Sequence, residues 1–238
     1  MSEPIAMRPV ALLRTPFPEK FGVPRQSGLI EEAEGFVEFL PEFAGADFVR
    51  GIEGFSHLWL ITAFHLSPPW TGAATVRPPR LGGNERLGVF ATRSPNRPNP
   101  IALSLVKLVA VESEPTLRLR VSGVDAADAT PVLDIKPYLP WCEARTDAAA
   151  DWAAGRPEER APEALVFEPG LEPQRQRLAP RTLALIARVL RLNPKPAYHV
   201  DPERIYGMTV AGWNVRWSDD GEIIRVVDLR EEEADLGL

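Results

Sequence analysis

Short apolar runs bounded by glycine, proline and aspartate recur along the first part of the chain, and no other feature restricts the fold as strongly. The runs are PVALLR (9–14), GFVEFL (35–40), HLWLITAF (57–64), RLGVFA (86–91), IALSLVKLVAV (101–111), TLRLRVSGV (116–124) and PVLDIKPYL (131–139). Runs of this length between turn residues are typical of β-strands. The spacing therefore predicts a mainly antiparallel barrel or sandwich.

Two of these runs differ in which faces they bury. The run 57–64 is apolar at nearly every position, which predicts a strand buried on both faces. The run 116–121 alternates polar and apolar residues, which predicts one face in water.

Composition divides the chain into three segments. We expect the main β domain at residues 1–145 and a loose linker rich in Ala, Glu and Pro at residues 146–178. In residues 179–238, apolar positions three and four apart predict a helix over 182–192. The strings IYGMTVAGWNVRW and GEIIRVVDL, joined by SDDG, then predict a hairpin. The last segment is thus an expected small α+β domain.

Composition also excludes several classes of site. No apolar run is long enough to cross a bilayer and the N-terminus lacks a signal peptide pattern, so the expected location is cytoplasmic. The single cysteine, Cys142, excludes an intrachain disulfide. The three histidines are His57, His65 and His199, and the first two are roughly 26 Å apart if they share one strand. No metal site is expected. The glycine fingerprint of dinucleotide sites is absent as well.

The segment RSPNRPNP (93–100) separates two expected strands. Its prolines fix the backbone and bias the residues before them away from helix, so it is a rigid loop. The surrounding residues 76–107 are basic although the formal net charge of the chain is −6. Either the arginines are scattered over the surface by chance, or they form a site for a negatively charged ligand.

Polar residues also occur inside the strand candidates and at their ends. Asp134 and Lys136 share strand parity and could form a structural ion pair. Alternatively, they line a cleft with Tyr138 and the loop of residues 93–100, which we call the arginine loop, where charged neighbours would shift their pKa values. His65, Asp125 and Asp128 stand at expected strand ends and turns, where binding sites are commonly built.

Several strings, taken together and in order, closely resemble the bacterial tRNA N6-threonylcarbamoyladenosine methyltransferases. They are VPRQSGL (23–29), RGIEGFSHLWLI (50–61), TVRPPRLGG (75–83), GVFATRSPNRPNPIALSLV (88–106), DATPVLDIKPYLP (128–140) and NVRW (214–217). The resemblance implies a single-sheeted β-barrel that binds S-adenosylmethionine, acts as a homodimer with the cofactor near the subunit interface, and methylates N6 of threonylcarbamoyladenosine beside the anticodon of threonine tRNA. The small domain would help to hold the anticodon arm.

The resemblance also implies site residues. The cofactor site would include Pro24, Arg25, Gln26, His65, Leu66, Arg93, Leu103, Asp125, Ala126, Ala127 and Asp128. Asp134 or Tyr138 would accept the proton of N6, with Lys136 or Arg93 neutralising a substrate carboxylate or phosphates. The expected tRNA contacts are Arg77, Arg80, Arg86 and Arg97. Two positions depart from the family pattern, Asn96, where an aromatic residue is usual, and Ala102, where glycine is usual.

A different class of function uses the same basic loop. A noncatalytic module could hold RNA or an acidic ligand without chemistry. Purified protein would then carry neither S-adenosylmethionine nor its demethylated product.

Overall fold

The structure is a computed structural model and describes residues 5–195 and 201–232. His199, one of the three histidines considered for a metal site, lies outside the described residues. Within the described ranges no helix is long and apolar enough to cross a membrane.

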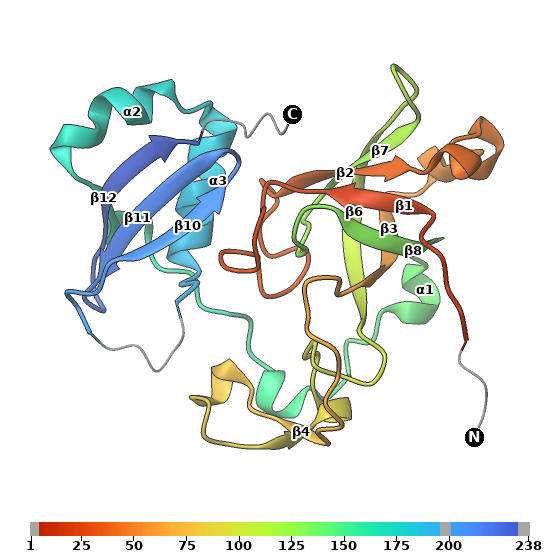
Figure 1. The fold of residues 1–238 in the computed structure, drawn as a ribbon, viewed down its shortest axis with the longest axis horizontal. Coiled ribbons are helices and arrows are strands. Elements are labelled where there is room, and N and C mark those ends of the chain that lie inside the picture. Colours follow the sequence, from red (N-terminus) through yellow and green to blue (C-terminus); the bar gives the residue numbers. More distant parts are fainter. Residues whose placement is uncertain (1–4, 196–200, 233–238) are drawn as a thin grey trace.

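Six antiparallel strands close into a barrel, with the order β1-β2-β7-β6-β3-β8 (Figure 1). They are β1 (Ala11–Arg14), β2 (Glu34–Phe39), β3 (His57–Ala63), β6 (Ile101–Glu112), β7 (Arg118–Ser122) and β8 (Thr130–Pro137). The expected mainly β architecture with a barrel is confirmed. The short helix α1 (Pro140–Glu143) follows the last strand.

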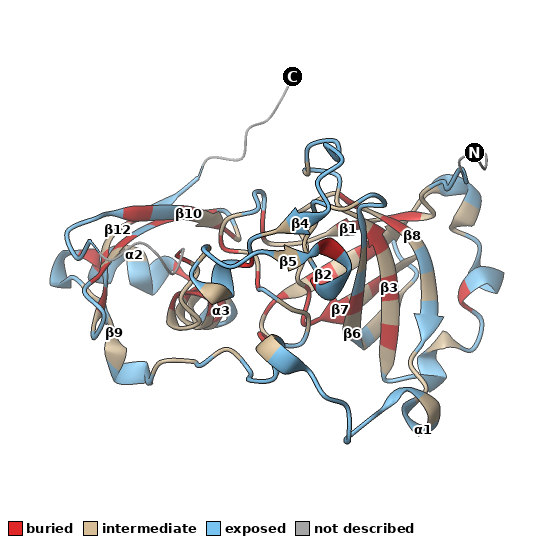
Figure 2. Ribbon diagram, turned by 90° about the horizontal axis from the view of Figure 1, so that it is seen from below, coloured by how far each residue is buried: buried red, intermediate tan, exposed pale blue. Residues whose placement is uncertain are grey.

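The barrel interior is filled by aliphatic side chains from alternate positions of the strands. Leu13, Val37, Leu58, Leu60 and Leu119 are almost completely buried. In β3 buried and half-exposed residues alternate (Figure 2), so the prediction that this strand is buried on both faces is wrong. A closed barrel has only one interior, and the outward side chains of β3 remain partly exposed.

Residues 64–100 leave the barrel between β3 and β6 and form what we call the arm (Figure 1). Its regular structure is a minimal ladder of β4 (Thr75–Val76) and β5 (Leu87–Gly88), followed by a 3₁₀ turn over Val89–Ala91. The strand predicted over 86–91 is therefore only two residues long. The β4–β5 pairing cannot extend further, because the prolines of this segment lack a backbone N–H to donate and Gly82 and Gly83 have positive φ.

The C-terminal part is a four-stranded sheet with the order β10-β11-β12-β9. Its elements are β9 (Leu165–Phe167), α2 (Glu172–Arg177), α3 (Pro180–Arg191), β10 (Tyr206–Val210), β11 (Trp213–Asp219) and β12 (Ile224–Glu231). The helix predicted over 182–192 is α3, and the predicted hairpin is formed by β11 and β12.

Two details of this part differ from the sequence prediction. The run 205–217 is not one strand, because Ala211 and Gly212 both have positive φ and form a tight turn between β10 and β11. Within the expected linker, β9 pairs in parallel with β12 and so belongs to the sheet.

The loop of residues 15–32 packs against the C-terminal sheet and α3. Phe21 stacks on Trp217 with ring centroids 5.9 Å apart, and Ala211 N donates a hydrogen bond of 2.7 Å to Pro16 O. Gly22 has φ +91°, and a Cβ there would lie 2.9 Å from Met208 Sδ. The hydrophobic core is consequently one cluster through both parts of the chain.

Candidate functional site

A cavity of about 400 Å³ opens at the barrel end where β3 finishes and β6 and β8 begin. Its walls come from the 20–26 loop, the end of β3, the arginine loop of the arm, the start of β6 and the β7–β8 loop. Every predicted cofactor residue except Asp128 lines it: Pro24, Arg25, Gln26, His65, Leu66, Arg93, Leu103, Asp125, Ala126 and Ala127. Residues far apart in the sequence are thus brought together.

Asp125 is the one carboxylate among the described residues that line the cavity. Ser104 Oγ donates a hydrogen bond of 2.5 Å to Asp125 Oδ1. Burial raises the pKa of Asp125 above its ordinary value, and the hydrogen bond from Ser104 opposes part of that rise. A cationic ligand in the cavity would find a ready counter-charge here.

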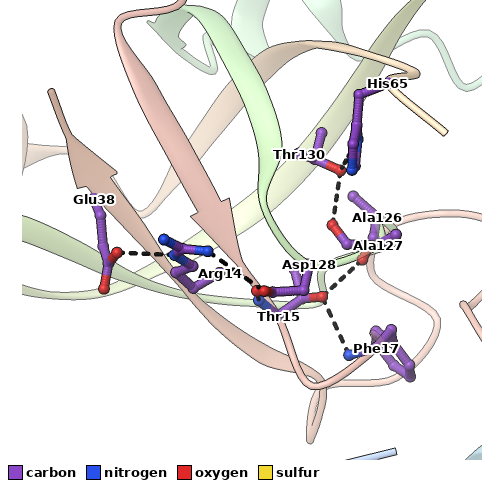
Figure 3. A network of polar contacts seen from close by, with 9 residues as sticks. All are labelled: Arg14, Thr15, Phe17, Glu38, His65, Ala126, Ala127, Asp128 and Thr130. Atoms are coloured by element: carbon purple, nitrogen blue, oxygen red, sulfur yellow. Dashed lines mark hydrogen bonds and ion pairs between the residues drawn. The ribbon is translucent and has the colours of Figure 1, made fainter. Parts of the chain in front are cut away.

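His65 is oriented by a short chain of hydrogen bonds, drawn in Figure 3. Thr130 Oγ1 donates its only proton to Ala127 O at 2.7 Å, so it must accept in its 3.3 Å contact with His65 Nδ1. His65 therefore carries its proton on Nδ1. In the neutral ring, Nε2 is then free of a proton and can accept one.

Asp128 lies outside the cavity, which differs from its expected role as a direct cofactor contact. Its Oδ1 accepts a hydrogen bond of 2.8 Å from Thr15 N, and its Oδ2 lies 3.5 Å from Arg14 Nη1 (Figure 3). Thr15 Oγ1 in turn donates to Ala126 O at 2.9 Å. Asp128 thus fastens the loop that forms the cavity wall to the end of β1.

Cations surround the cavity mouth. Lys20, Arg25, Arg93 and Arg97 line it, and Arg93 donates a hydrogen bond to the Gln26 side chain. Arg25 donates to Asn193 O at 3.1 Å; its burial and then the nearby charge of Arg80 lower its pKa. The guanidinium group of Arg25 at the mouth therefore lies within electrostatic reach of Arg80.

The arginines of the arm differ from most others in the protein. Within the described residues none of them forms an ion pair: Arg77, Arg80, Arg86, Arg93 and Arg97. By contrast, Asp219 pairs with both Arg160, at 2.8 Å, and Lys195, at 2.9 Å. The charge of the arm is therefore available to a ligand.

The predicted catalytic residues lie away from the cavity within this chain. Asp134 and Lys136 form an ion pair of 3.0 Å with half-exposed side chains, which is the first of the two alternatives drawn from the sequence. Tyr138 packs edge-on against Trp59 and His57. The cause is a β-bulge: the pairing of β8 with β3 shifts between Ile61 and Thr62, and beyond the shift Asp134 turns outward.

Some residues at the site were not identified from the sequence. Thr62 and Ser104 line the cavity from inward positions of apolar strands and are almost fully buried. The sequence signal for both is a polar residue at an inward position of an otherwise apolar strand. Of the two departures from the family pattern, Ala102 lines the cavity.

Comparison with known proteins gives a consistent result over nearly the whole chain. The family model described as the tRNA-methyltransferase O N-terminal domain matches residues 12–144, and that of the TrmO C-terminal domain matches residues 164–232. The tRNA (adenine(37)-N6)-methyltransferase of Escherichia coli (strain K12) is 44% identical over 214 residues, which is 87% of this chain and 90% of the relative.

Two further matches come from Pseudomonas aeruginosa. A putative S-adenosylmethionine-dependent methyltransferase, RcsF, is 39% identical over 232 residues, covering 94% of this chain and 97% of the relative. A crystal structure of TrmO from the same species superposes with a TM-score of 0.77 at 34% identity, covering 96% of this chain and 99% of that one.

Proposed function

Because the chain belongs to the tRNA-methyltransferase O family and is an S-adenosylmethionine-dependent tRNA methyltransferase, we propose that its substrate is threonylcarbamoyladenosine beside the anticodon of threonine tRNA. The methyl group is added to N6. The observation that carries this proposal is a cavity with one buried carboxylate and a rim of arginines that have no ion-pair partner among the described residues.

The cavity fits the cofactor in size and chemistry. Its volume falls in the range of about 300–1,000 Å³ that is typical of small-molecule sites. When bound, S-adenosylmethionine supplies a methyl group on a positively charged sulfonium. We propose that Asp125 faces the positive charge of the cofactor, that Arg25 or Arg93 binds its carboxylate, and that Leu103 and Ala126 pack against its apolar parts.

The nitrogen that receives the methyl group must lose a proton. Methyl transfer is mainly a problem of positioning two reactants, and a nearby base accepts the proton as the new bond forms. In this chain alone, His65 Nε2 is the cavity group prepared for that task, because Nδ1 already holds the ring proton. Asp134 and Tyr138 could act only in the cavity of a partner subunit.

The arm is the proposed RNA contact. Phosphate binding requires clustered Lys and Arg, and the arm supplies arginines that form no ion pair with a described carboxylate. We assign Arg77, Arg80, Arg86 and Arg97 to the tRNA backbone. Arg93, which hydrogen bonds to Gln26 at the cavity, is assigned to the cofactor side.

Dimer formation and a cytoplasmic location are also proposals. Phe48 and Trp141 are large apolar residues exposed on the outside of the barrel, and covering them would favour association. Sedimentation equilibrium at working concentration tests this: a monomer of full activity would exclude the shared site. A tRNA substrate is encountered in the cytoplasm.

The decisive experiment measures methyl incorporation from labelled S-adenosylmethionine into two tRNA preparations. One comes from cells that make threonylcarbamoyladenosine, and the other is an unmodified transcript of threonine tRNA. We expect methylation of the first only, identified by nucleoside mass spectrometry as N6-methylated threonylcarbamoyladenosine. Equal methylation of the unmodified transcript would contradict the proposed substrate.

A further inference from the structure

Phe90 is the most exposed aromatic residue of the arm. Its exposed fraction is 82%, whereas its neighbour Val89 is buried and Thr92 is nearly so. Phe90 lies in the 3₁₀ turn that follows β5. A single exposed apolar residue is ordinary, so the inference depends on how this ring is held and what surrounds it.

The turn that carries Phe90 is held on both sides. Val89 N donates to Ala74 O at 3.0 Å, and Thr92 Oγ1 donates back to Val89 O at 2.9 Å. From the segment after the barrel, Trp152 Nε1 donates to Ala91 O at 3.2 Å. A ring on such a fixed turn loses little conformational entropy when it is covered.

The arginines close to Phe90 in the sequence favour a polyanionic occupant. Arg86 and Arg93 flank it in the sequence, and neither forms an ion pair among the described residues. A second aromatic residue of the arm, Trp70, is partly exposed. Exposed aromatic rings among arginines are the composition that binds unpaired nucleotides, since every base has a π face to stack.

Phe90 is also close to the cavity. Arg93 lines the cavity and is three residues away, so the two Cα atoms are at most about 11 Å apart. A nucleotide on Phe90 would therefore be a near neighbour of the nucleotide whose base enters the cavity.

We propose that Phe90 is a stacking platform for an unpaired base next to the methylated adenosine, and that it holds the loop of the RNA while the target base occupies the cavity. This inference rests on the proposed function, because it assumes an RNA loop as substrate. It adds a base contact to the phosphate contacts of the arginines. An apolar contact with a second copy of the chain would use the same ring but would gain nothing from the arginines of the arm.

The test compares Phe90→Ala, Phe90→Leu and Phe90→Trp with a control, Phe55→Ala. Phe55 is an exposed aromatic residue that lies outside the arm and before the start of β3, whereas the cavity lies at the end of that strand. Binding of threonylcarbamoylated tRNA is measured by filter retention at several salt concentrations. We expect Phe90→Ala to weaken binding roughly 5- to 150-fold, as loss of one stacked base predicts, with an unchanged slope against salt.

The other variants separate stacking from simple burial. Phe90→Trp should bind at least as well as wild type, Phe90→Leu should bind nearly as poorly as Phe90→Ala, and Phe55→Ala should bind normally. 2-Aminopurine placed in turn at each unpaired position of a synthetic anticodon stem-loop should be quenched at one position by the wild type and not by Phe90→Ala.

Three results would overturn the inference. They are normal binding by Phe90→Ala, full rescue by leucine, and a loss of RNA binding that follows a loss of dimer in sedimentation. The proposed function fails by a different result, which is absence of methylation by the wild-type protein. A wild type that methylates tRNA while Phe90→Ala binds it normally leaves the function standing and removes only the platform.

Discussion

Burial raises the pKa of the Asp125 carboxylate, and this shift makes the stability of the protein depend on pH. Its folded pKa lies above the unfolded value of about 3.9, so its contribution to stability is present below that pH and is lost as pH rises through the folded pKa. At neutral pH the carboxylate therefore costs stability in the free protein.

We accordingly predict opposite effects of Asp125→Asn on stability and on binding. Without bound cofactor, the stability of the variant minus that of wild type should be more favourable at pH 7 than at pH 4. Thermal unfolding of both proteins at both pH values measures this difference. Its affinity for S-adenosylmethionine, measured by calorimetry at pH 7, should fall because a cation loses its counter-charge. Equal affinity of variant and wild type would show that Asp125 does not face the cofactor.

Asp128 provides a second prediction, based on its position behind the cavity wall. Removing its carboxylate in Asp128→Ala takes the acceptor from Thr15 N, and loss of this part-buried hydrogen bond should cost about 0.5–1.5 kcal/mol of unfolding free energy. Cofactor affinity should fall as a consequence of the loosened loop. Asp128→Asn keeps one oxygen for Thr15 N and should retain most of both properties. A loss of affinity without any loss of stability would instead indicate a direct contact.

Among the elements, the arm should separate two kinds of arginine. Arg86→Ala should weaken tRNA binding and reduce the slope of log affinity against log salt by about 0.7 for one single-strand phosphate contact. Arg93→Ala should reduce cofactor binding or turnover, because Arg93 contacts Gln26 at the cavity. Arg93→Lys should not restore it fully, since a point charge does not replace a guanidinium fork. Methyl incorporation at several salt concentrations distinguishes the two, and a fully active Arg93→Ala would contradict the assignment.

Elements with strong local patterns could be predicted from the sequence. The 3.6-residue periodicity identified α3, and the Asp-Gly turn identified the β11–β12 hairpin. The strands of the barrel were found because their ends are marked by turn residues. The tight turn at Ala211 was missed, because alanine rarely takes a positive φ.

The candidate site was only partly predictable, and the reason is again physical. The cofactor residues were assigned through family resemblance, and the fold brings nearly all of them to one cavity. The outward position of Asp134 depends on a bulge between β3 and β8, which is a property of strand pairing and leaves no mark in a single strand. Strand parity alone could not decide between the ion pair and the cleft.

At the scale of the whole molecule, the cavity is connected to the C-terminal part. Arg25 lines the cavity and hydrogen bonds to Asn193 O just after α3, while Arg188 of α3 donates to Leu29 O at 3.2 Å. Because the core is continuous across both parts, the C-terminal part supports the loop that lines the cavity.

The last prediction concerns the assembly and the residues that lie outside the cavity of their own chain. Suppose that the proposed dimer brings β8 of one subunit to the cavity of the other. Tyr138→Phe and Asp134→Asn then damage the part of the shared site that one subunit supplies, and Arg93→Ala damages the part that the other subunit supplies. Each variant alone should be nearly inactive. After joint unfolding and refolding of an equal mixture, half of the dimers should be mixed and each should hold one intact site, which restores about a quarter of wild-type methylation. If these residues act within their own chain, both sites of the mixed dimer are defective. An inactive mixture with proven subunit exchange would therefore contradict the shared site. Full activity of Tyr138→Phe and Asp134→Asn would show that neither residue takes part in the reaction.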